Sequence, residues 1–585
     1  MKASYLINKQ YLLALTLALG AMTTTQSAVI QHAGDRYIIN VAEMELTGEE
    51  SLLDVLQLCP DLITLDGNNV LGGDPFSDMY GKYAIRIDNQ EYGLDYTTLL
   101  HHLKAREIEQ IKICHNAEVM KGCSSLKRII DINLRKSENT TSGRIGLFGD
   151  TYGGGKVIAS VLHQEDKLRI LSHVEGNMQR SSDDSNLSNH YSHEGAKVGL
   201  CWTPTERDNL EIDLFQTYTR NRMTSSLANY ARNYHFQADY THTLANNGSS
   251  ILFTLSTEHI GDNGGNPGEK YHNRSDYPCG VVELAFPILS KDLWMTAGFE
   301  GGFSIEKNCI ANYTNHSDYQ DYYGQLDWNI GKWTFMVGDR YRIIHFNLKQ
   351  IDSKDKHTTH DNAYTVSAAY SFTPGNTLQG SFAHRFYNAE FGDFITTAGD
   401  QENEWTPIYT NDPNRRVAYV SELKHTFSSP CFVISSQMQN IRQDIKNGHD
   451  NRLGIGSTLF WHTGILRLTT GFNYYWEKQS TLEHYNYEGG KQQDGTYWDH
   501  LHSNYAVFKL APQLSLAEGW RFTSNLLWST RRHEYTLTYA PANLYAEIGV
   551  YKNFGKHWAL EGRFHDIAGQ HTGNHAATIG ATYYW

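Results

Sequence analysis

Over roughly the last three quarters of the chain, apolar and polar side chains alternate in segments of about ten residues, each followed by a turn. In segment 466–477, Phe472 and Trp476 lie on one face, and Arg467 and Asn473 lie on the other. A period of two is typical of a β-strand whose two faces have different surroundings. One face suits lipid and the other suits water, so the pattern predicts strands that cross a membrane.

The same alternation returns in segments 520–529, 543–553 and 558–565, and aromatic side chains stand near the ends of most lipid-type stripes. Transmembrane β-barrels carry aromatic girdles at these positions. A large soluble all-β protein, such as a propeller or a β-helix, also alternates. However, soluble strands rarely place Trp and Tyr at both ends, and the sequence has no internal repeat of blade length.

Connections between the alternating segments are short and long in turn. The short ones are 245–248, 289–292, 330–332, 374–376, 462–464, 517–519 and 554–557, and the long polar ones are about 262–277, 309–321, 388–415 and 479–502. Outer-membrane barrels have short turns on the periplasmic side and long loops outside. The spacing predicts an all-β transmembrane barrel of about 22 antiparallel strands over residues 137–585, wide enough to need a plug.

The first residues have the pattern of a secretory signal. Lys2 and Lys9 precede a weakly polar to apolar run over 11–22, and small residues follow near Ala28. Twelve residues are too few for a membrane-spanning helix, so we expect residues 1–28 to be a signal peptide.

Residues 29–136 differ from the rest and predict a small α/β domain in the barrel lumen. Segment 51–62 reads as a short amphipathic helix that Pro60 ends. Segments 82–93 and 128–136 read as strands, and segment 103–113 reads as a helix that continues into a strand.

Composition supports this division. The chain has 585 residues, 12% of them aromatic, and a mean hydropathy of −0.52. That value suits strands with one polar and one apolar face, and the aromatic content excludes disorder. The formal charge of −14 would become more negative without Lys2 and Lys9, which excludes nucleic acid as a partner. Seven cysteines without a CxxC spacing define no zinc or redox site; Cys114 and Cys123 could pair or stay apart.

In order and spacing, several phrases resemble the TonB-dependent outer-membrane receptors, particularly the Bacteroidetes type with a compact plug. The phrases are DRYIINV at 35–41, LLDVLQLCPDL at 52–62, GNNV at 67–70, YAIRIDN at 83–89, EIEQIKI at 107–113 and SLKRIIDINLRK at 125–136, with 378–394 and 411–427 inside the barrel. The chain departs from the family at Asn388, where a proline is usual, and at Asp412. It therefore resembles a diverged member.

The resemblance implies partners. An extended stretch near the mature N-terminus of such receptors adds as a strand to the TonB energiser. Tyr37, Ile38, Ile39 and Val41 are the candidates, although they also suit the first strand of the plug. The final aromatic, Trp585, resembles the signal read by the barrel-assembly machinery. Outer-membrane lipid and a surface lipoprotein complete the implied partners, and the implied location is the outer membrane of a Bacteroidetes-like cell.

The outward apex of the plug is predicted at loop 72–82. Its candidate ligand-binding side chains pair aromatic groups with carboxylates, which suits a sugar or a peptide; they are Asp74, Phe76, Asp78, Met79 and Tyr80. The alternative is a loop that only fills the lumen.

Candidate chemistry beyond binding is sparse. The sequence lacks GxSxG, HExxH and GxxxxGK[ST], so no catalytic residue and no enzyme activity is predicted. His500 with His502, and His357 with His360, have spacings that could hold a metal or haem, but loop histidines are commonly only polar. We predict no metal and no cofactor.

The resemblance implies the import of a scarce nutrient, such as a siderophore, glycan, peptide or cofactor, through a plugged barrel. The alternative is an outer-membrane channel or surface adhesin that kept the fold but lost energy coupling. The short N-terminal segment ahead of residue 35 and the departures from the family motifs favour that alternative.

Overall fold

The structure is a computed structural model, and it describes most of residues 30–585. The residues outside the description, besides 1–29, are 34–35, 45, 60–61, 66–68, 73–82, 89, 92–98, 101–102, 115–127, 136–139, 152, 183–187, 223–227, 245–246, 267–268, 309–312, 350–353, 374, 387–394, 400–404, 410–416, 430, 446–447, 486–494, 536–537, 541 and 566–575. The predicted signal peptide, the plug-apex loop and Cys123 therefore lie outside the described residues.

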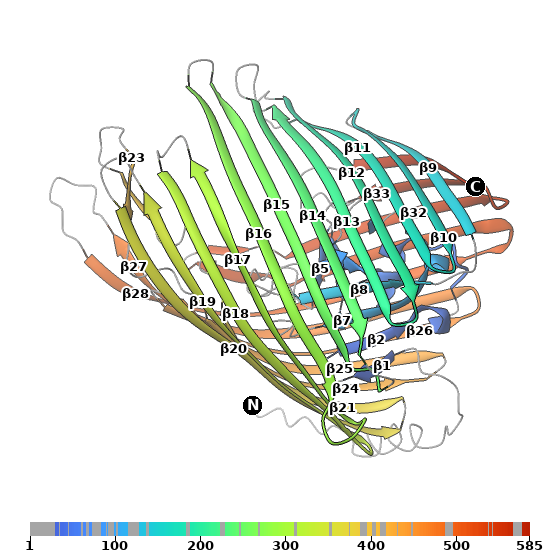
Figure 1. Ribbon diagram of the computed structural model, residues 1–585. Coiled ribbons are helices and arrows are strands. Elements are labelled where there is room, and N and C mark those ends of the chain that lie inside the picture. The colour runs from blue at the N-terminus through green and yellow to red at the C-terminus, as the bar shows by residue number, and fades with distance from the viewer. Residues whose placement is uncertain are drawn as a thin grey trace, which may run out of the picture.

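Residues 140–584 form a closed barrel of 22 strands (Figure 1). Each strand pairs antiparallel with its neighbours, and β34 pairs with β9 to close the sheet. The strands are β9 (Thr140–Asp150), β10 (Gly155–Glu165), β11 (Leu168–Ser182), β12 (Ser188–Thr205), β13 (Asp208–Arg222), β14 (Ala228–Thr243), β15 (Ser250–Asn266), β16 (Glu269–Pro287), β17 (Leu293–Asn308), β18 (Tyr313–Ile330), β19 (Trp333–Lys349), β20 (Lys354–Thr373), β21 (Asn376–Phe386), β24 (Val417–Ser428), β25 (Phe432–Ile445), β26 (Gly448–Thr463), β27 (Leu466–Tyr485), β28 (Gly495–Ser515), β29 (Trp520–Ser529), β32 (Asn543–Phe554), β33 (Trp558–His565) and β34 (Ala576–Tyr584). The predicted fold class is confirmed, and closure leaves no strand edge unpaired in lipid.

The alternating positions read from the sequence correspond to the two faces of the barrel wall, with the apolar positions outward and the polar positions toward the lumen. On β27, Phe472 and Trp476 are 41% and 40% exposed, whereas Arg467 and Thr469 are 2% and 0% exposed. A strand that shows apolar side chains outward and covers its polar ones has lipid outside and the plug inside.

The short connections are tight turns, as predicted. Gly331, Gly464 and Gly555 have φ values of 60°, 41° and 63°, a left-handed conformation that glycine adopts without strain.

Three of the four long connections are shorter than predicted, whereas 388–415 lies between the end of β21 and the start of β24, as predicted. Segment 262–277 is mostly strand, because β15 continues to Asn266 and β16 starts at Glu269, and most of 309–321 belongs to β18. Polar composition marked these segments as loops, but antiparallel pairing satisfies the backbone outside the membrane as well as inside it. Two small hairpins occupy other outer connections: β22 (Ile395–Gly399) with β23 (Trp405–Tyr409), and β30 (Arg532–Tyr535) with β31 (Thr538–Ala540).

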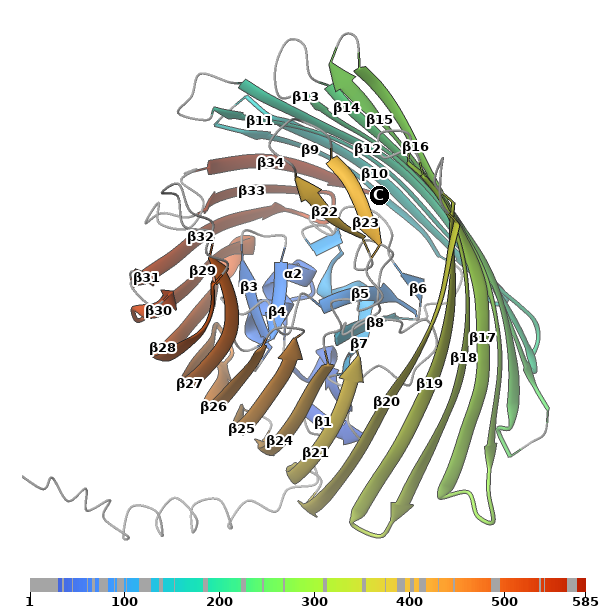
Figure 2. The same ribbon diagram turned by 90° about the vertical axis from the view of Figure 1, so that its left-hand side faces the viewer.

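The described residues between 30 and 135 lie inside the barrel (Figure 2). They contain a six-stranded sheet in the order β1-β2-β7-β8-β5-β6, in which β5 and β8 are parallel. The strands are β1 (Ile30–Ala33), β2 (Arg36–Asn40), β5 (Tyr83–Ile87), β6 (Gln90–Glu91), β7 (Ile108–Cys114) and β8 (Arg128–Leu134), beside the hairpin β3 (Leu62–Leu65) and β4 (Asn69–Gly72). We call this segment the plug.

Helix α2 (Leu52–Leu58) lies within the predicted segment 51–62, and Leu99 and Leu100 are helical as well. The helix predicted in 103–113 is wrong: that segment holds η3 (Ala105–Glu107), a single 3-10 turn, ahead of β7, and another such turn, η1 (Val41–Met44), follows β2. Strand β7 is an inner strand of the plug sheet; Ile111 and Ile113 are buried on it, and so is Ile108 on the other side of a register shift. No helix among the described residues is both long and apolar enough to span a membrane.

The hydrophobic core of the plug extends to the barrel wall. Its buried cluster includes the α2 leucines and the isoleucines of β7 and β8, together with Phe215, Val433 and Phe460 from three barrel strands. The plug is therefore packed against the barrel by apolar contacts as well as by the polar ones described next.

Candidate functional site: the contact between plug and barrel

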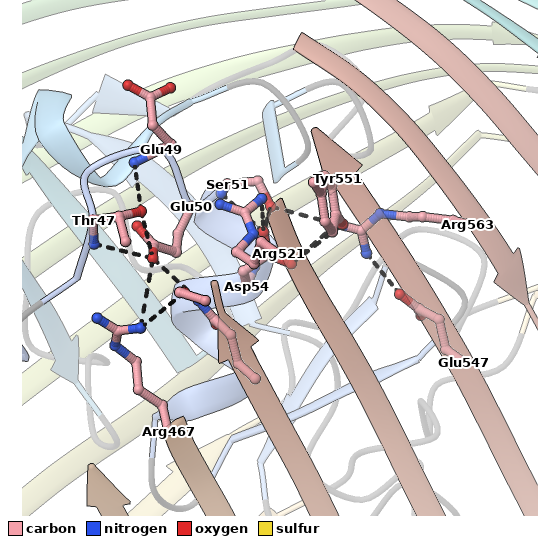
Figure 3. Close-up of polar contacts among 12 residues, drawn as sticks. Thr47, Glu49, Glu50, Ser51, Asp54, Arg467, Arg521, Glu547, Tyr551 and Arg563 are labelled. Atoms are coloured by element: carbon pink, nitrogen blue, oxygen red, sulfur yellow. Dashed lines mark hydrogen bonds and ion pairs between the residues drawn. The ribbon is translucent and has the colours of Figure 1, made fainter. Parts of the chain in front are cut away.

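The start of α2 carries a carboxylate that serves both the helix and the barrel. Ser51 caps the helix: its Oγ accepts a hydrogen bond from the Asp54 amide at 3.2 Å, and its own amide donates to Asp54 Oδ2 at 3.0 Å. This reciprocal capping box fixes the first turn. Asp54 is 1% exposed, and its remaining acceptor capacity points to the wall (Figure 3).

Two arginines on neighbouring parts of the wall meet that carboxylate. Arg521 of β29 lies 3.0 Å from Asp54 Oδ2, and Arg563 of β33 lies 3.1 Å from Oδ1. Arg563 is also 2.6 Å from Glu547 of β32, which is 2% exposed (Figure 3). These buried charges stabilise one another, because removing any one of them would leave another buried ion without a partner of opposite charge.

A second acidic residue extends the contact. Glu50 is 0% exposed; Gln513 of β28 donates to its Oε1 at 3.1 Å, and Arg467 of β27 lies 4.0 Å away. Thr47 donates to the same oxygen through its amide and its hydroxyl. The wall from β27 to β33 thus presents arginines to the two carboxylates at the start of α2.

The end of α2 is held through backbone carbonyls. Thr469 donates to the Leu58 carbonyl at 2.7 Å, and the Lys509 ammonium donates to the carbonyls of Cys59 and Leu62 at 3.3 and 2.6 Å. The last carbonyls of a helix lack intrahelical partners and favour a cation. We call these contacts, from Glu50 to Leu62, the α2 latch.

The α2 latch depends on ionised Asp54, so the docking of the plug should depend on pH. Burial by itself raises the pKa of Asp54, but Arg521, Arg563 and the Ser51 hydrogen bonds more than offset it and hold the pKa below the ordinary 3.8. A carboxyl with a depressed folded-state pKa stabilises the fold above 3.8 and loses that contribution as the pH falls through its lower value. We expect protection of the plug from a protease to be flat from pH 7 to about pH 4 and to fall only in stronger acid. A fall that begins near pH 6 would contradict an ionised Asp54 latch.

The opposite wall, from β11 to β13, contacts the plug differently. Asp88, just after β5, pairs with Arg169 of β11 at 2.7 Å and accepts from the Leu134 amide at 3.0 Å. Burial raises the pKa of Asp88 even though Arg169 opposes that change. Beside this pair lies a cavity between plug and wall, lined also by Lys197 and Glu211. This wall therefore contacts the plug beside a cavity, whereas Asp54, Glu50 and their arginine partners in the α2 latch are buried.

The structure places the predicted coupling residues inside the plug. Tyr37, Ile38 and Ile39 belong to β2, which pairs with β1 on one side and β7 on the other, and Val41 starts η1. Ile39 and Val41 are 1% and 2% exposed. In this arrangement the stretch has no free edge to offer a partner strand.

Trp585 lies at the seam of the barrel. Its amide donates to the Gly143 carbonyl at 3.1 Å, and it accepts from the Gly143 amide at 3.2 Å, so the last residue joins the first barrel strand. Its ring is 44% exposed on the outer surface. Whether the assembly machinery reads it stays a prediction.

The other sequence candidates do not form a site together. His360 pairs with Tyr341 at 2.9 Å, and His500 pairs with Ser480 at 2.9 Å, each on its own strand pair. Within the part of the chain that the structure describes, no three His, Cys, Asp or Glu side chains are grouped to hold a metal ion.

The comparisons with known proteins agree with this architecture. A sequence model described as "TonB dependent receptor-like, beta-barrel" matches residues 131–423. No curated protein matches the sequence. The siderophore receptor PiuA from Acinetobacter baumannii has a TM-score of 0.67 at 11% identity, over 95% of this chain and 97% of that one. The ferric-catecholate import receptor Fiu from E. coli K12, in its closed form, gives 0.67 at 10%, over 96% and 100%. The copper transporter OprC gives 0.66 at 8%, over 94% and 100%.

A 22-stranded barrel with a packed plug is the architecture of outer-membrane receptors that import nutrients. The chain belongs to the TonB-dependent receptor family. It is thus a receptor and transporter of the outer membrane, of a kind that works with TonB.

Proposed function

We propose that this receptor imports a scarce nutrient by moving the β5–β8 side of the plug while the α2 latch stays docked. The observation that carries the proposal is the difference between the two walls. The latch combines two buried carboxylates with arginines from three strands, whereas at β11–β13 Asp88 of the plug pairs with Arg169 of the wall beside a cavity. A path opened along the second wall costs fewer buried charge contacts.

The candidate ligand contacts remain those of the plug apex, Asp74, Phe76, Asp78, Met79 and Tyr80. Aromatic faces beside carboxylates suit hydroxyl-rich or amide-rich compounds. The similar structures are described as a siderophore receptor, a copper transporter and a hemophore receptor with heme. We propose a siderophore, glycan, peptide or cofactor as the class to test.

Partners and chain organisation are part of the proposal. Residues 1–28 would direct export, 29–136 form the plug, and 137–585 form the barrel. Trp585 would be read by the barrel-assembly machinery, outer-membrane lipid would surround the barrel, and a surface lipoprotein would deliver the ligand. The compact plug favours a Bacteroidetes-type source.

Energy coupling through residues 37–41 is tested by deletion. A strain lacking the gene is first screened for lost growth on ferric siderophores, heme, glycans and peptides, which identifies the imported compound. Deleting residues 29–41 should then lower energised uptake at least about tenfold, because it removes β2, which would add to the energiser after separating from β1. Deleting 29–34 is the matched control, since it removes β1 and keeps β2.

Both variants must show the heat-modifiable migration of a folded barrel. Uptake that survives the 29–41 deletion would refute coupling through this stretch and favour the uncoupled channel. Uptake lost equally in both variants would place the coupling stretch ahead of residue 35.

A further inference from the structure

Three of the four neighbouring strands β17 to β20 carry lysines at their outer ends, and the fourth, β18, carries a threonine there. The register places Lys307 of β17 opposite Thr314 of β18, Thr314 opposite Lys349 of β19, and Lys349 opposite Lys354 of β20. Three lysines and a threonine therefore form one row across four adjacent strands. Lys356 follows two residues after Lys354 on β20 and lies on the same face of the strand. We call these four lysines the lysine row.

The lysine row faces away from the lumen. On β19, Arg342, Ile344 and Phe346 are buried, whereas Tyr341 and His345 are exposed, so the odd-numbered positions point outward. Lys349 has the same parity as Tyr341 and is exposed. Lys307, Lys354 and Lys356 are exposed as well, on the outward parity of their own strands.

The described side chains around the row bring little opposite charge. Among the outward positions that the structure describes in 303–307, 314–318, 345–349 and 354–358, Asp318 is the one carboxylate. Histidines add to the basic character, since His316 and His345 share the patch. A chain of formal charge −14 thus concentrates positive charge on one outer surface.

Neighbouring lysines of the row repel one another, and a bound anion removes that repulsion. Like charges directly opposite each other on antiparallel strands are destabilising, and Lys349 faces Lys354. A phosphate between two ammonium groups converts the repulsion into two charge-assisted hydrogen bonds. Thr314, in the middle of the row, supplies a further hydroxyl donor.

Height above the membrane narrows the class of anion. Lys349 lies eight residues beyond the exposed Tyr341, which at 3.3 Å per residue and a strand tilt of about 40° is about 20 Å higher. Lys307 lies four residues beyond the exposed Phe303, or about 10 Å higher. The polar layer of a phospholipid bilayer is only about 5–8 Å deep on each side. Relative to these exposed aromatic side chains, Lys307 and Lys349 therefore lie farther out than the depth of a phospholipid headgroup layer.

We propose that the lysine row binds phosphate groups on the saccharide headgroup of an outer-leaflet glycolipid. The exposed aromatic and aliphatic side chains below, including Phe303 and Tyr322, would contact the acyl chains of the same lipid. Such a molecule anchors one side of the barrel in the outer leaflet. This role is independent of what the receptor imports.

The test uses the full-length protein in detergent micelles. Binding is titrated with a phosphorylated outer-membrane glycolipid, the same glycolipid after phosphatase treatment, phosphatidylglycerol and inorganic phosphate. The variant carries Lys307→Gln, Lys349→Gln, Lys354→Gln and Lys356→Gln. The matched control carries Lys167→Gln, Lys291→Gln, Lys332→Gln and Lys556→Gln, four exposed lysines in the short turns at the other end.

Wild type and control should bind the phosphorylated glycolipid equally, and the row variant should bind at least about tenfold more weakly, since a basic side chain near an anionic surface contributes about 1 kcal/mol. Raising the salt concentration should narrow the difference. Equal binding by wild type and row variant would overturn the proposal. So would undiminished binding of the dephosphorylated glycolipid, or phosphatidylglycerol or inorganic phosphate binding as tightly as the phosphorylated glycolipid. Heat-modifiable migration confirms that each variant is folded.

Discussion

Replacing Asp54 with alanine is expected to free the start of α2 from the barrel wall and make the closed barrel leak. The change leaves Arg521 and Arg563 without their shared carboxylate, and both are buried. Removing one member of a buried ion group costs about 3–5 kcal/mol. The change also removes the acceptor of the Ser51 amide, which is the reciprocal half of the capping box. A shift of 3–5 kcal/mol raises the undocked fraction about 150- to 5,000-fold.

The leak is measured as ion conductance of the purified protein in planar bilayers and as sensitivity of expressing cells to vancomycin. Asp54→Asn should be intermediate, because the amide can still cap the helix but carries no charge. The control is Glu49→Gln, which breaks the partly exposed pair with Arg106 at 2.5 Å and should change docking by no more than about 1 kcal/mol. Equal conductance for Asp54→Ala and Glu49→Gln would show that the α2 latch does not hold the plug.

The barrel could be predicted from the sequence because the alternation within each strand shows which of its faces meets lipid and which meets the lumen. Phe472 and Arg467 differ by an odd number of positions, and that parity alone assigns one to lipid and the other to the lumen. Helix α2 was likewise predictable, because Pro60 follows a compact run of leucines. Strand length was harder, since pairing in β15 and β16 continues through polar sequence that looks like a loop.

The α2 latch could not be predicted, although its members were visible. Alternation places Arg467, Arg521 and Arg563 on the lumen face, and the sequence shows two acids near the start of a helix. Nothing local joins Asp54 to residues more than 460 positions later; that pairing depends on how the plug is rotated inside the closed barrel. The one local signal was the serine–aspartate spacing of the capping box, which marks Asp54 as a helix cap and not as an ion-pair partner.

The two walls differ in the number of buried charged groups that separate when the plug moves during import. Movement at β11–β13 separates Asp88 from Arg169, whereas movement at α2 exposes Asp54, Glu50 and their arginines together. Burial raises the pKa of Asp88, so keeping that carboxylate ionised in the docked plug costs free energy, which is regained when it moves into water. The arginines lower the pKa of Asp54, so its ionised form stabilises the docked plug. The plug is thus expected to have a fixed end and a moving end.

Cross-linking the two ends separately should distinguish them. Asp88→Cys with Arg169→Cys, joined by a short reducible bifunctional thiol reagent, should lower uptake of the identified compound at least about tenfold, and reduction should restore it, because the moving end is tied to the wall. The comparison variant, Lys509→Cys, is joined in the same way to the native Cys59 at the end of α2 and should retain uptake. Cys201, which lines the cavity, is replaced with serine in both to prevent its capture. Loss of uptake in both variants would mean that the whole plug leaves the wall, and loss only in the Cys59 variant would reverse the assignment of the two ends.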